Sequence, residues 1–400
     1  MLNELKDKIQ KKALNKWLNN EKIGTAELAT GVGKTILALH ALYTMDKDDS
    51  IHLFLAETTE RKKDLLKDIK LFNKLFNCDV VNDYNIKFYC YQTVYKWKDR
   101  SFGLVIADEI HDSLSPNYSK FYFNNSYKAI IGLSATVDRK TKYEQGDTIF
   151  TKGHLLDKIA PVIFKYTISE GQSEGVSRKL NIYVINHELE AVEKTVKAGS
   201  LKKSFLQTEK ASYDYWDKEH KRSWFLEDEE LKSLKIRITS HKRSHLLFNL
   251  PSKISVIKTL LKNIDGKTII FGNSLDSLLK ITNNVVSSKN SEDKNDLIRS
   301  NFDNNKINHI ASFKKLKQGA NLTNIDNCII HSYYGVEKDI IQRVGRLRQN
   351  GDKIGNVFIL LTKNTQEEIW FSKMMENMND FNIINCDNIE DCIIKYKQNE

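Results

Sequence analysis

The stretch ELATGVGKT, residues 27–35, decides the fold, because it joins a candidate strand at 25–28 to the helix-forming segment ILALHALYTM. Gly31 and Gly33 lack a Cβ atom, so the backbone can wrap closely around a phosphate and point several N–H groups at it. The following helix would direct its positive N-terminus at the same anion. The sequence therefore predicts a nucleotide phosphate-binding loop in an α/β domain.

Two residues of this loop have side chains suited to a nucleotide. Lys34 is expected to reach the β- and γ-phosphates, and the Thr35 hydroxyl to ligate Mg²⁺. Leu28 stands where the general P-loop pattern has glycine, but residues 29–35 match the form A-T-G-x-G-K-T. A chance glycine-rich turn is the alternative, and the order strand, loop, GKT, helix argues against it. The candidate nucleotide-binding residues are Ala29, Thr30, Gly31, Val32, Gly33, Lys34, Thr35 and Ile36.

A pair of acids follows a second apolar strand in the segment LVIADEIHD. Ligands of an open α/β sheet bind at the carboxyl ends of its strands, so Asp108 and Glu109 are expected beside the loop. Asp108 would hold Mg²⁺ through water, and Glu109 would polarise the attacking water. His111, two residues further on, could sense the γ-phosphate. In GLSATVDR, Ser134 and Thr136 end another apolar strand.

Short apolar runs alternate with helix-length segments along the whole chain, which is typical of a mostly parallel sheet with helices on both faces. We therefore expect an α/β fold of two doubly wound domains, at residues 1–162 and 163–400. The candidate strands are 25–28, 51–56, 86–91, 104–108, 129–134, 181–185, 268–271, 307–312, 327–331 and 357–361.

Residues 190–249 break this pattern, because they are long, charged and expected to be helical, with no clear strand. Basic and aromatic side chains interleave there, and such residues can stack on bases and pair with phosphates. The alternative, that the aromatics pack against the second domain, is favoured by their helical spacing. The tail, residues 365–400, is also expected to be helical. The interleaved residues are Lys202, Lys203, Tyr213, Tyr215, Trp216, Lys221, Arg222, Trp224 and Phe225.

The composition is that of a globular protein, with 40% hydrophobic and 28% charged residues in 400. A net charge of +10 suits a polyanionic partner. Five cysteines without a CxxC pair argue against a zinc site or disulfide framework and favour a reducing cytoplasm. No signal peptide or membrane span is evident, so no membrane partner is expected. The richness in Asn, Lys and Ile favours an AT-rich genome, and a bacterial or phage-infected host cell is the expected location.

Ordered motifs extend along nearly the whole chain and resemble those of superfamily-two helicases and translocases of the DExH kind. ATGVGKT, DEIH and SAT are followed by IIFGNS, ASFKKLKQGANL and QRVGRLRQ, which resemble motifs IV, V and VI. AETTERKKDLL and CYQTVYKW resemble motifs Ia and Ib more weakly. The resemblance implies two tandem RecA-like domains that bind ATP between them, with a helical insertion at about 190–249 in the second.

The resemblance also implies roles for residues of the second domain. Arg343 and Arg346 lie three residues apart, share a helix face and would reach the γ-phosphate as arginine fingers. Gly319 and Asn321 of motif V would join the nucleotide site. Gln10 would read adenine through its amide, and a solvated helix glutamine is the alternative. The coupling residues would be His111, Ser134, Thr136 and Gln342, and the nucleic-acid contacts would be Thr58, Arg61, Thr93, Asn273, Ser274, Ser312 and Lys315.

The function that these motifs favour is an ATP-dependent helicase or translocase that uses Mg²⁺ and acts on DNA in replication, recombination or repair. Motif VI ends in Gln349 where related chains often have Arg, which favours translocation on a duplex over strand separation. Two alternatives stay open: an RNA helicase, and the motor subunit of a restriction or defence complex. In the latter, protein partners would dock on residues 190–249 or on the tail.

Overall fold

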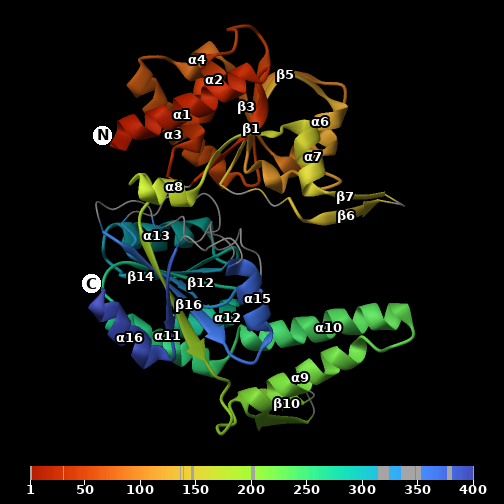
Figure 1. The fold of residues 1–400 in the computed structure, drawn as a ribbon, viewed down its shortest axis with the longest axis vertical. Helices are drawn as coiled ribbons and strands as arrows, with labels where there is room; N and C mark the ends of the chain where they lie inside the picture. Colours follow the sequence, from red (N-terminus) through yellow and green to blue (C-terminus); the bar gives the residue numbers. More distant parts are fainter. Residues whose placement is uncertain are drawn as a thin grey trace. The chain divides into compact units, whose positions relative to one another are not determined.

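The computed structural model describes residues 2–29, 31–135, 137, 139–145, 148–199, 203–313, 324–334, 347, 353–375 and 381–399. They form two compact units, the first running from Met1 to Lys179 and the second beginning at Leu180. Each unit has a parallel sheet flanked by helices (Figure 1), so the expected tandem α/β fold is confirmed. The units divide after Lys179 and not at 162, because β8 (Val162–Tyr166) pairs with β1 (Ile23–Leu28) in the first sheet.

Helices cover both faces of the six-stranded sheet of the first unit, whose strand order is β3-β2-β4-β5-β1-β8 and whose pairs are all parallel. A separate antiparallel hairpin is formed by β6 and β7. Besides β1 and β8, the strands are β2 (Ile51–Ala56), β3 (Asn85–Cys90), β4 (Ser101–Asp108), β5 (Ser126–Ser134), β6 (Lys142–Gln145) and β7 (Thr148–Thr151). The helices are α1 (Leu2–Asn19), α2 (Lys34–Tyr43), α3 (Glu60–Phe76), α4 (Val80–Asp83), α5 (Tyr91–Val94), the 3₁₀ turn η1 (Ile110–Asp112), α6 (Lys120–Asn124), α7 (Lys152–Ile159) and α8 (Ile168–Ser173).

Successive residues of the central strands enter two different cores, one on each face of the sheet. In β2, Phe54 packs in the core that contains Trp17 of α1, while Leu53 and Leu55 pack in the core that contains Ile110. A parallel sheet covered on both faces requires such nearly continuous apolar strands. This is why β2, β4 and β5 could be recognised in the sequence as short apolar runs.

The second unit contains a seven-stranded parallel sheet in the order β13-β14-β12-β15-β16-β9-β17. Its strands are β9 (Leu180–His187), β12 (Thr268–Gly272), β13 (Val285–Ser287), β14 (His309–Phe313), β15 (Asn327–Ile330), β16 (Gly355–Thr362) and β17 (Asn382–Cys386), with a separate hairpin of β10 (Val196–Gly199) and β11 (Ser204–Gln207). The helices are α9 (Glu209–Ser223), α10 (Glu229–Leu247), α11 (Pro251–Asn263), α12 (Leu275–Ile281), α13 (Glu292–Asp303), α15 (Gln366–Met375) and α16 (Ile389–Gln398).

The structure corrects two expectations about strands in this unit. Residues 190–249 contain the antiparallel β10–β11 hairpin, and the tail contains β17, which pairs with β9. The expected helices are present in both segments, as α9, α10, α15 and α16. The strands were missed because the hairpin strands have four residues each and β17 has five, too few for a clear alternation. The rest of the described tail packs as helices, and Tyr396 of α16 is buried in the core.

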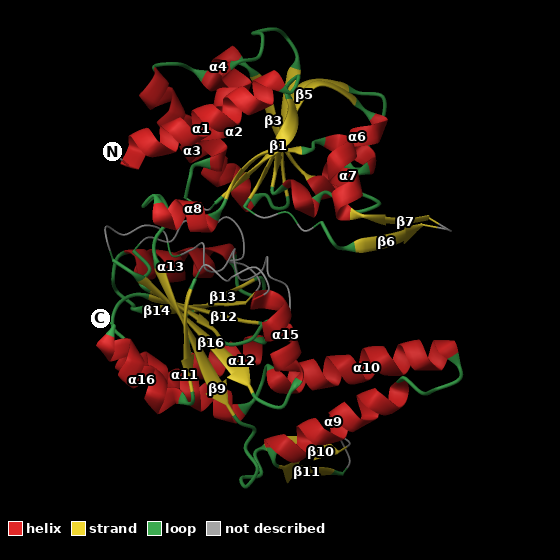
Figure 2. Ribbon diagram, in the orientation of Figure 1, coloured by secondary structure: helices red, strands yellow, loops and turns green. Residues whose placement is uncertain are grey.

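Helices α9 and α10 form an antiparallel pair, here named the arm, that extends away from the sheet of its own unit (Figure 2). Tyr213, at the root of the arm, is buried as the packing alternative predicted. Toward the tip that alternative is wrong, since Trp224 is 56% exposed and Phe225 is 86% exposed. The arm thus has a packed root and an open aromatic tip.

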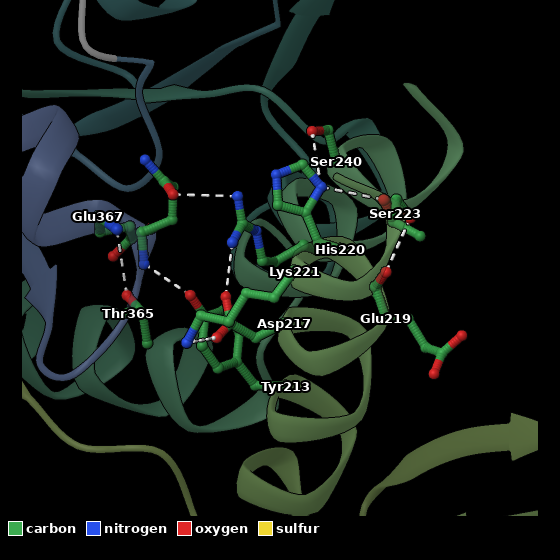
Figure 3. Close-up of polar contacts among 12 residues, drawn as sticks. Tyr213, Asp217, Glu219, His220, Lys221, Ser223, Ser240, Thr365 and Glu367 are labelled. Carbon is green, nitrogen blue, oxygen red and sulfur yellow. Dashed lines mark hydrogen bonds and ion pairs between the residues drawn. The ribbon is translucent and has the colours of Figure 1, made fainter. Parts of the chain in front are cut away.

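The root of the arm is tied to the beginning of α15 by side chains from both arm helices. Arg243 of α10 donates to Asp217 Oδ1 of α9 at 2.5 Å and to Gln366 Oε1 at 3.0 Å. The Tyr213 hydroxyl accepts a hydrogen bond from the backbone N–H of Gln366 at 2.6 Å. Figure 3 shows these contacts converging between the arm and α15. The arm and α15 are therefore joined through polar bonds that are partly shielded from water.

Among the described residues, no helix combines the length and the apolar composition that crossing a bilayer requires.

Candidate active site

The site lies at one edge of the first sheet, where strands separated in sequence end side by side. β5 pairs with both β1 and β4, and all three run in the same direction. The phosphate loop follows β1, Asp108 is the last residue of β4, and Ser134 is the last residue of β5. Parallel strands present their carboxyl ends at the same edge, so the sheet itself brings these residues together.

The loop adopts a backbone that glycine permits and other residues resist. Gly31 and Gly33 have φ values of 89° and 93°, and a Cβ on Gly31 would meet no atom of the described residues within 4 Å. α2 begins at Lys34, so the N–H groups of its first turn can bond an anion held by the loop. Gln10 of α1 is buried against the loop and donates from Nε2 to the carbonyl of Val32 at 2.7 Å. A Cβ on Gly33 would lie only 2.6 Å from that same nitrogen.

The burial of Gln10 contradicts the alternative of a solvated helix glutamine. Only 5% of the residue is exposed, and within the described part of the chain its Oε1 atom has no hydrogen-bond partner. An amide with one bonded nitrogen and one unused oxygen can still accept from an exocyclic amino group. Gln10 therefore supports the loop, and its Oε1 atom is buried without a hydrogen-bond partner among the described residues.

Lys34 and Glu109 form an ion pair across the site, with Lys34 Nζ 2.6 Å from Glu109 Oε1. Both side chains are partly exposed, at 15% and 21%, so a ligand can reach them. Glu109 has a φ of 49°, in the left-handed region that residues with a Cβ seldom occupy. Such local strain is common where a side chain must be directed into a functional site.

Arg61, from the first turn of α3, lies between the two residues expected to hold Mg²⁺. Its Nε donates to Asp108 Oδ2 at 2.5 Å, and its terminal NH₂ donates to Thr35 Oγ1 at 2.7 Å. Burial lowers the pKa of Arg61, but the carboxylates of Asp108, Asp68 and Asp64 raise it more, so its pKa lies above the ordinary value. The guanidinium is thus a firmly charged cation between two oxygen ligands.

His111 and Ser134 connect the acidic segment to the end of β5. Their side chains lie 2.7 Å apart, between His111 Nδ1 and Ser134 Oγ. The Ser134 hydroxyl also lies 3.3 Å from Glu109 Oε2. His111 and Ser134 are both buried, so a displacement of Glu109 would change the hydrogen bonds of both side chains.

Tyr91 is a supporting residue that sequence reasoning missed. Tyr91 packs in the core that contains Ile110, and its hydroxyl donates to the backbone carbonyl of Asp108 at 2.9 Å. Burial raises the pKa of this hydroxyl well above its ordinary value. The hydroxyl therefore stays protonated and holds the turn that carries Asp108 and Glu109. Tyr91 lies within CYQTVYKW, the segment that resembles motif Ib, but that resemblance indicated contacts with nucleic acid and not a bond to the turn after β4.

The donor set fits Mg²⁺ and a nucleotide. Within the described residues, no group of three or more His, Cys, Asp and Glu side chains could hold a metal ion alone. Mg²⁺ usually takes one or two protein oxygens, several waters and the phosphates of its nucleotide. Thr35 Oγ1 and Asp108 Oδ2 converge on a single cationic group here, as such a site requires.

Two family models match this chain. One, described as type III restriction enzyme, res subunit, matches residues 4–139, and the other, helicase conserved C-terminal domain, matches residues 252–351. The chain belongs to the superfamily-two helicases and translocases. It is therefore an ATP-dependent enzyme of that superfamily, with the phosphate loop in the first match and motif VI in the second.

Individual relatives of this helicase-superfamily chain agree with the family match. The DNA 3'-5' translocase XPB2 of Sulfurisphaera tokodaii is 23% identical over 383 residues, which cover 91% of this chain and 84% of the relative. Among solved structures, Dbp5 of S. cerevisiae bound to RNA and ADP BeF3 is similar in fold, with a TM-score of 0.60, 12% identity, and coverage of 98% and 92%.

The fold also resembles the type ISP restriction-modification enzyme LlaBIII bound to DNA, with a TM-score of 0.60 and 13% identity. That match covers 98% of this chain but only 32% of the other, so this chain spans about a third of that enzyme. The two family models leave residues 140–251 between them. The arm therefore lies outside both matched segments.

The remaining residues predicted to contact nucleic acid differ in their surroundings. Thr93 of α5 is exposed, whereas Thr58 Oγ1 is buried and has no hydrogen-bond partner among the described residues. In the second unit, the Asn273 backbone N–H bonds the Ser332 hydroxyl, Ser274 caps α12, and Ser312 is buried in β14. The predicted site residues that lie outside the described residues are Thr30, Thr136, Lys315, Gly319, Asn321, Gln342, Arg343 and Arg346.

Proposed function

We propose that this chain hydrolyses Mg²⁺–ATP at the edge of its first sheet and uses the energy to move along DNA. The observation that carries this proposal is the assembly of Lys34, Thr35, Asp108 and Glu109 around an open loop whose glycines have positive φ. Phosphoryl transfer needs little covalent help from the protein, so its catalysis rests on positioning and on charge. This group supplies both.

Each side chain has a proposed role that follows from its chemistry. Lys34 holds the β- and γ-phosphates, Thr35 and Asp108 hold Mg²⁺, and Glu109 orients the attacking water. Held there by Thr35 and Asp108, Mg²⁺ would supply positive charge that stabilises the developing negative charge of the transferred phosphoryl group. The contact from Glu109 to Ser134 gives the acid a physical link to His111. Arg343 and Arg346 of motif VI, which lie outside the described residues, are proposed to stabilise the charge on the γ-phosphate.

DNA is the favoured strand because the relative that matches over most of this chain is named as a DNA translocase. The net charge of +10 supports a polyanionic partner but does not distinguish DNA from RNA. The five cysteines are free thiols, which supports a reducing compartment, and we propose the cytoplasm.

The decisive experiment measures ATP turnover of the purified chain with single-stranded DNA, duplex DNA, forked DNA and RNA as separate stimulants. DNA is expected to raise kcat more than RNA, and duplex DNA to be sufficient. The stimulation should weaken as salt rises, because phosphate contacts release counterions. Stimulation by RNA alone would transfer the proposal to RNA. Turnover that no strand affects would contradict a nucleic-acid motor.

The arm supports a second proposal, that a protein partner docks at its tip. Trp224 and Phe225 are exposed there, and residues 227–230 are four consecutive acids. Asp228 accepts from the N–H of Leu231 as the cap of α10, while Glu229 and Glu230 are exposed. Carboxylates repel phosphates, so this tip suits a partner with basic and apolar groups better than it suits a nucleic acid. In the described tail, Cys392 and Tyr396 pack in the core, while Ile369 and Ile394 are exposed.

Replacing both Trp224 and Phe225 by Ser is expected to leave DNA-stimulated ATP turnover and DNA affinity within about twofold of the parent chain, since the acidic tip would not contact a strand. Fluorescence anisotropy with labelled DNA and a coupled ATPase assay measure the two quantities. The matched control replaces Lys221 and Arg222, the basic pair one turn before the tip, by Ser as well. A tenfold loss of DNA affinity in the aromatic variant would place the tip on the strand instead.

A further inference from the structure

The position of Arg61 has a consequence for metal binding. Asp108 is only 4% exposed and Thr35 only 6%, so the oxygens that would hold Mg²⁺ are already shielded from water. A shielded carboxylate without a counter-charge is costly, and Arg61 supplies that charge through a direct bond to Oδ2. The same guanidinium also occupies the Thr35 hydroxyl. One cationic group thus satisfies both oxygens.

Arg61 and a metal ion compete for this position. Mg²⁺ must approach the Thr35 hydroxyl to about 2.1 Å, and Arg61 already lies at hydrogen-bond distance from the same oxygen. Two cations a few ångströms apart repel strongly in a partly buried site. Arg61 comes from the first turn of α3, directly after the loop that follows β2, so its long side chain can swing away without unfolding a strand.

We propose that Arg61 is a built-in counter-cation that holds the Mg²⁺ position in the nucleotide-free protein and is displaced when Mg²⁺ arrives with a nucleotide. Arg61 then has two opposite effects on nucleotide binding. Without Mg²⁺, its charge partly replaces the metal and supports the phosphates. With Mg²⁺, displacing it costs part of the binding free energy. Arg61 therefore reduces the dependence of nucleotide affinity on Mg²⁺. This inference rests on the proposed nucleotide site but goes beyond it.

The test is the ratio of two equilibrium constants for a fluorescent ADP analogue: its Kd in EDTA divided by its Kd in millimolar Mg²⁺. Replacing Arg61 by Gln should raise this ratio by at least about tenfold, because the metal loses a competitor and the metal-free nucleotide loses a partner; charge-assisted hydrogen bonds of this kind are strong enough. Arg61→Lys keeps a charge but cannot bond Asp108 Oδ2 and Thr35 Oγ1 together. Its ratio should therefore lie between those of the parent chain and of Arg61→Gln.

The control is Arg139→Gln, which removes an exposed arginine of the same unit that pairs with Asp157. Its ratio should equal that of the parent chain. If the Arg61→Gln ratio is unchanged or lower, Arg61 does not share the metal position and the proposal is overturned. If the role of Arg61 is only structural, Arg61→Gln should lower the melting temperature and leave the ratio of the two Kd values unchanged.

A second measurement applies to the protein without nucleotide. The melting temperature of Arg61→Gln should rise when millimolar Mg²⁺ is added, since the ion replaces the missing charge, while that of the parent chain should not respond. Failure of the proposed function gives a different result: the parent chain itself would bind the ADP analogue no better than a Lys34→Ala variant does. The inference fails alone when binding depends on Lys34 but the ratio does not depend on Arg61.

Discussion

Replacing Lys34 by Ala is expected to lower kcat for ATP by at least about 100-fold, because it removes the only charge that the loop itself brings to the transferred phosphate. Lys34 Nζ lies 2.6 Å from Glu109 Oε1, so the variant also removes the ion pair of the proposed water-orienting carboxylate. Single-turnover kinetics with saturating Mg²⁺–ATP and DNA would separate the loss of chemistry from a loss of binding.

The matched control for this prediction is Lys165→Ala, on β8 of the same sheet. Lys165 is 60% exposed and lies 3.8 Å from Glu27, so its removal should leave kcat within about twofold, as expected for an exposed pair. Both variants should keep the circular dichroism spectrum of the parent chain. A Lys34→Ala chain that turns over ATP at the parent rate would remove the basis for the nucleotide site.

The largest expected effect on stability comes from Lys253→Met in the second unit. Lys253 of α11 and Glu367 of α15 are both fully buried, and Lys253 Nζ lies 2.5 and 2.7 Å from the two carboxylate oxygens. Without the lysine, Glu367 is a buried charge that keeps only local donors such as the N–H of Thr362. Breaking a buried pair in this way typically costs about 3–5 kcal/mol.

Urea denaturation followed by circular dichroism measures this loss as a lower midpoint for the second unit. The double variant Lys253→Met with Glu367→Gln should recover most of it, because the neutral amide can still accept from Thr362. Lys210→Met, which breaks an exposed pair with Asp214 on α9, should change the stability by less than about 0.5 kcal/mol. Equal losses in the single and double variants would mean that packing, and not charge, explains the effect.

The long apolar strands and the loop between β1 and α2 were predictable because each depends on local sequence. β2 was predicted with its observed bounds, and β4 and β5 were predicted at their carboxyl ends, where Asp108 and Ser134 lie. The convergence of these ends required only the rule for parallel sheets. Short edge strands such as β13, with three residues, depend on pairing partners distant in sequence, so no local pattern indicated them.

The contacts of Arg61 could not be predicted for a different reason. Its motif indicated a contact with nucleic acid, whereas its bonds to Asp108 and Thr35 depend on how β2 and β4 neighbour each other and on the rotamer of a long side chain. Tyr91 is similar: it follows β3, while its hydroxyl bonds Asp108 at the end of β4, and β2 lies between these two strands in the sheet. Sequence patterns identify the elements, while side chains that cross between elements require the three-dimensional arrangement.

The arm has a mechanical consequence that follows from its length and its root. α10 begins at Glu229, and at 1.5 Å per residue it extends about 21 Å from there to Arg243, whose side chain is bonded to α15. If the helix moves as a rigid body, a rotation of about 10° at its root moves its tip by about 4 Å. α15 follows β16 in the chain. A small rotation of α15 would thus produce a larger displacement at the tip, where Trp224 and Phe225 are exposed. A partner bound at the tip would therefore be moved together with the arm as well as bound by it.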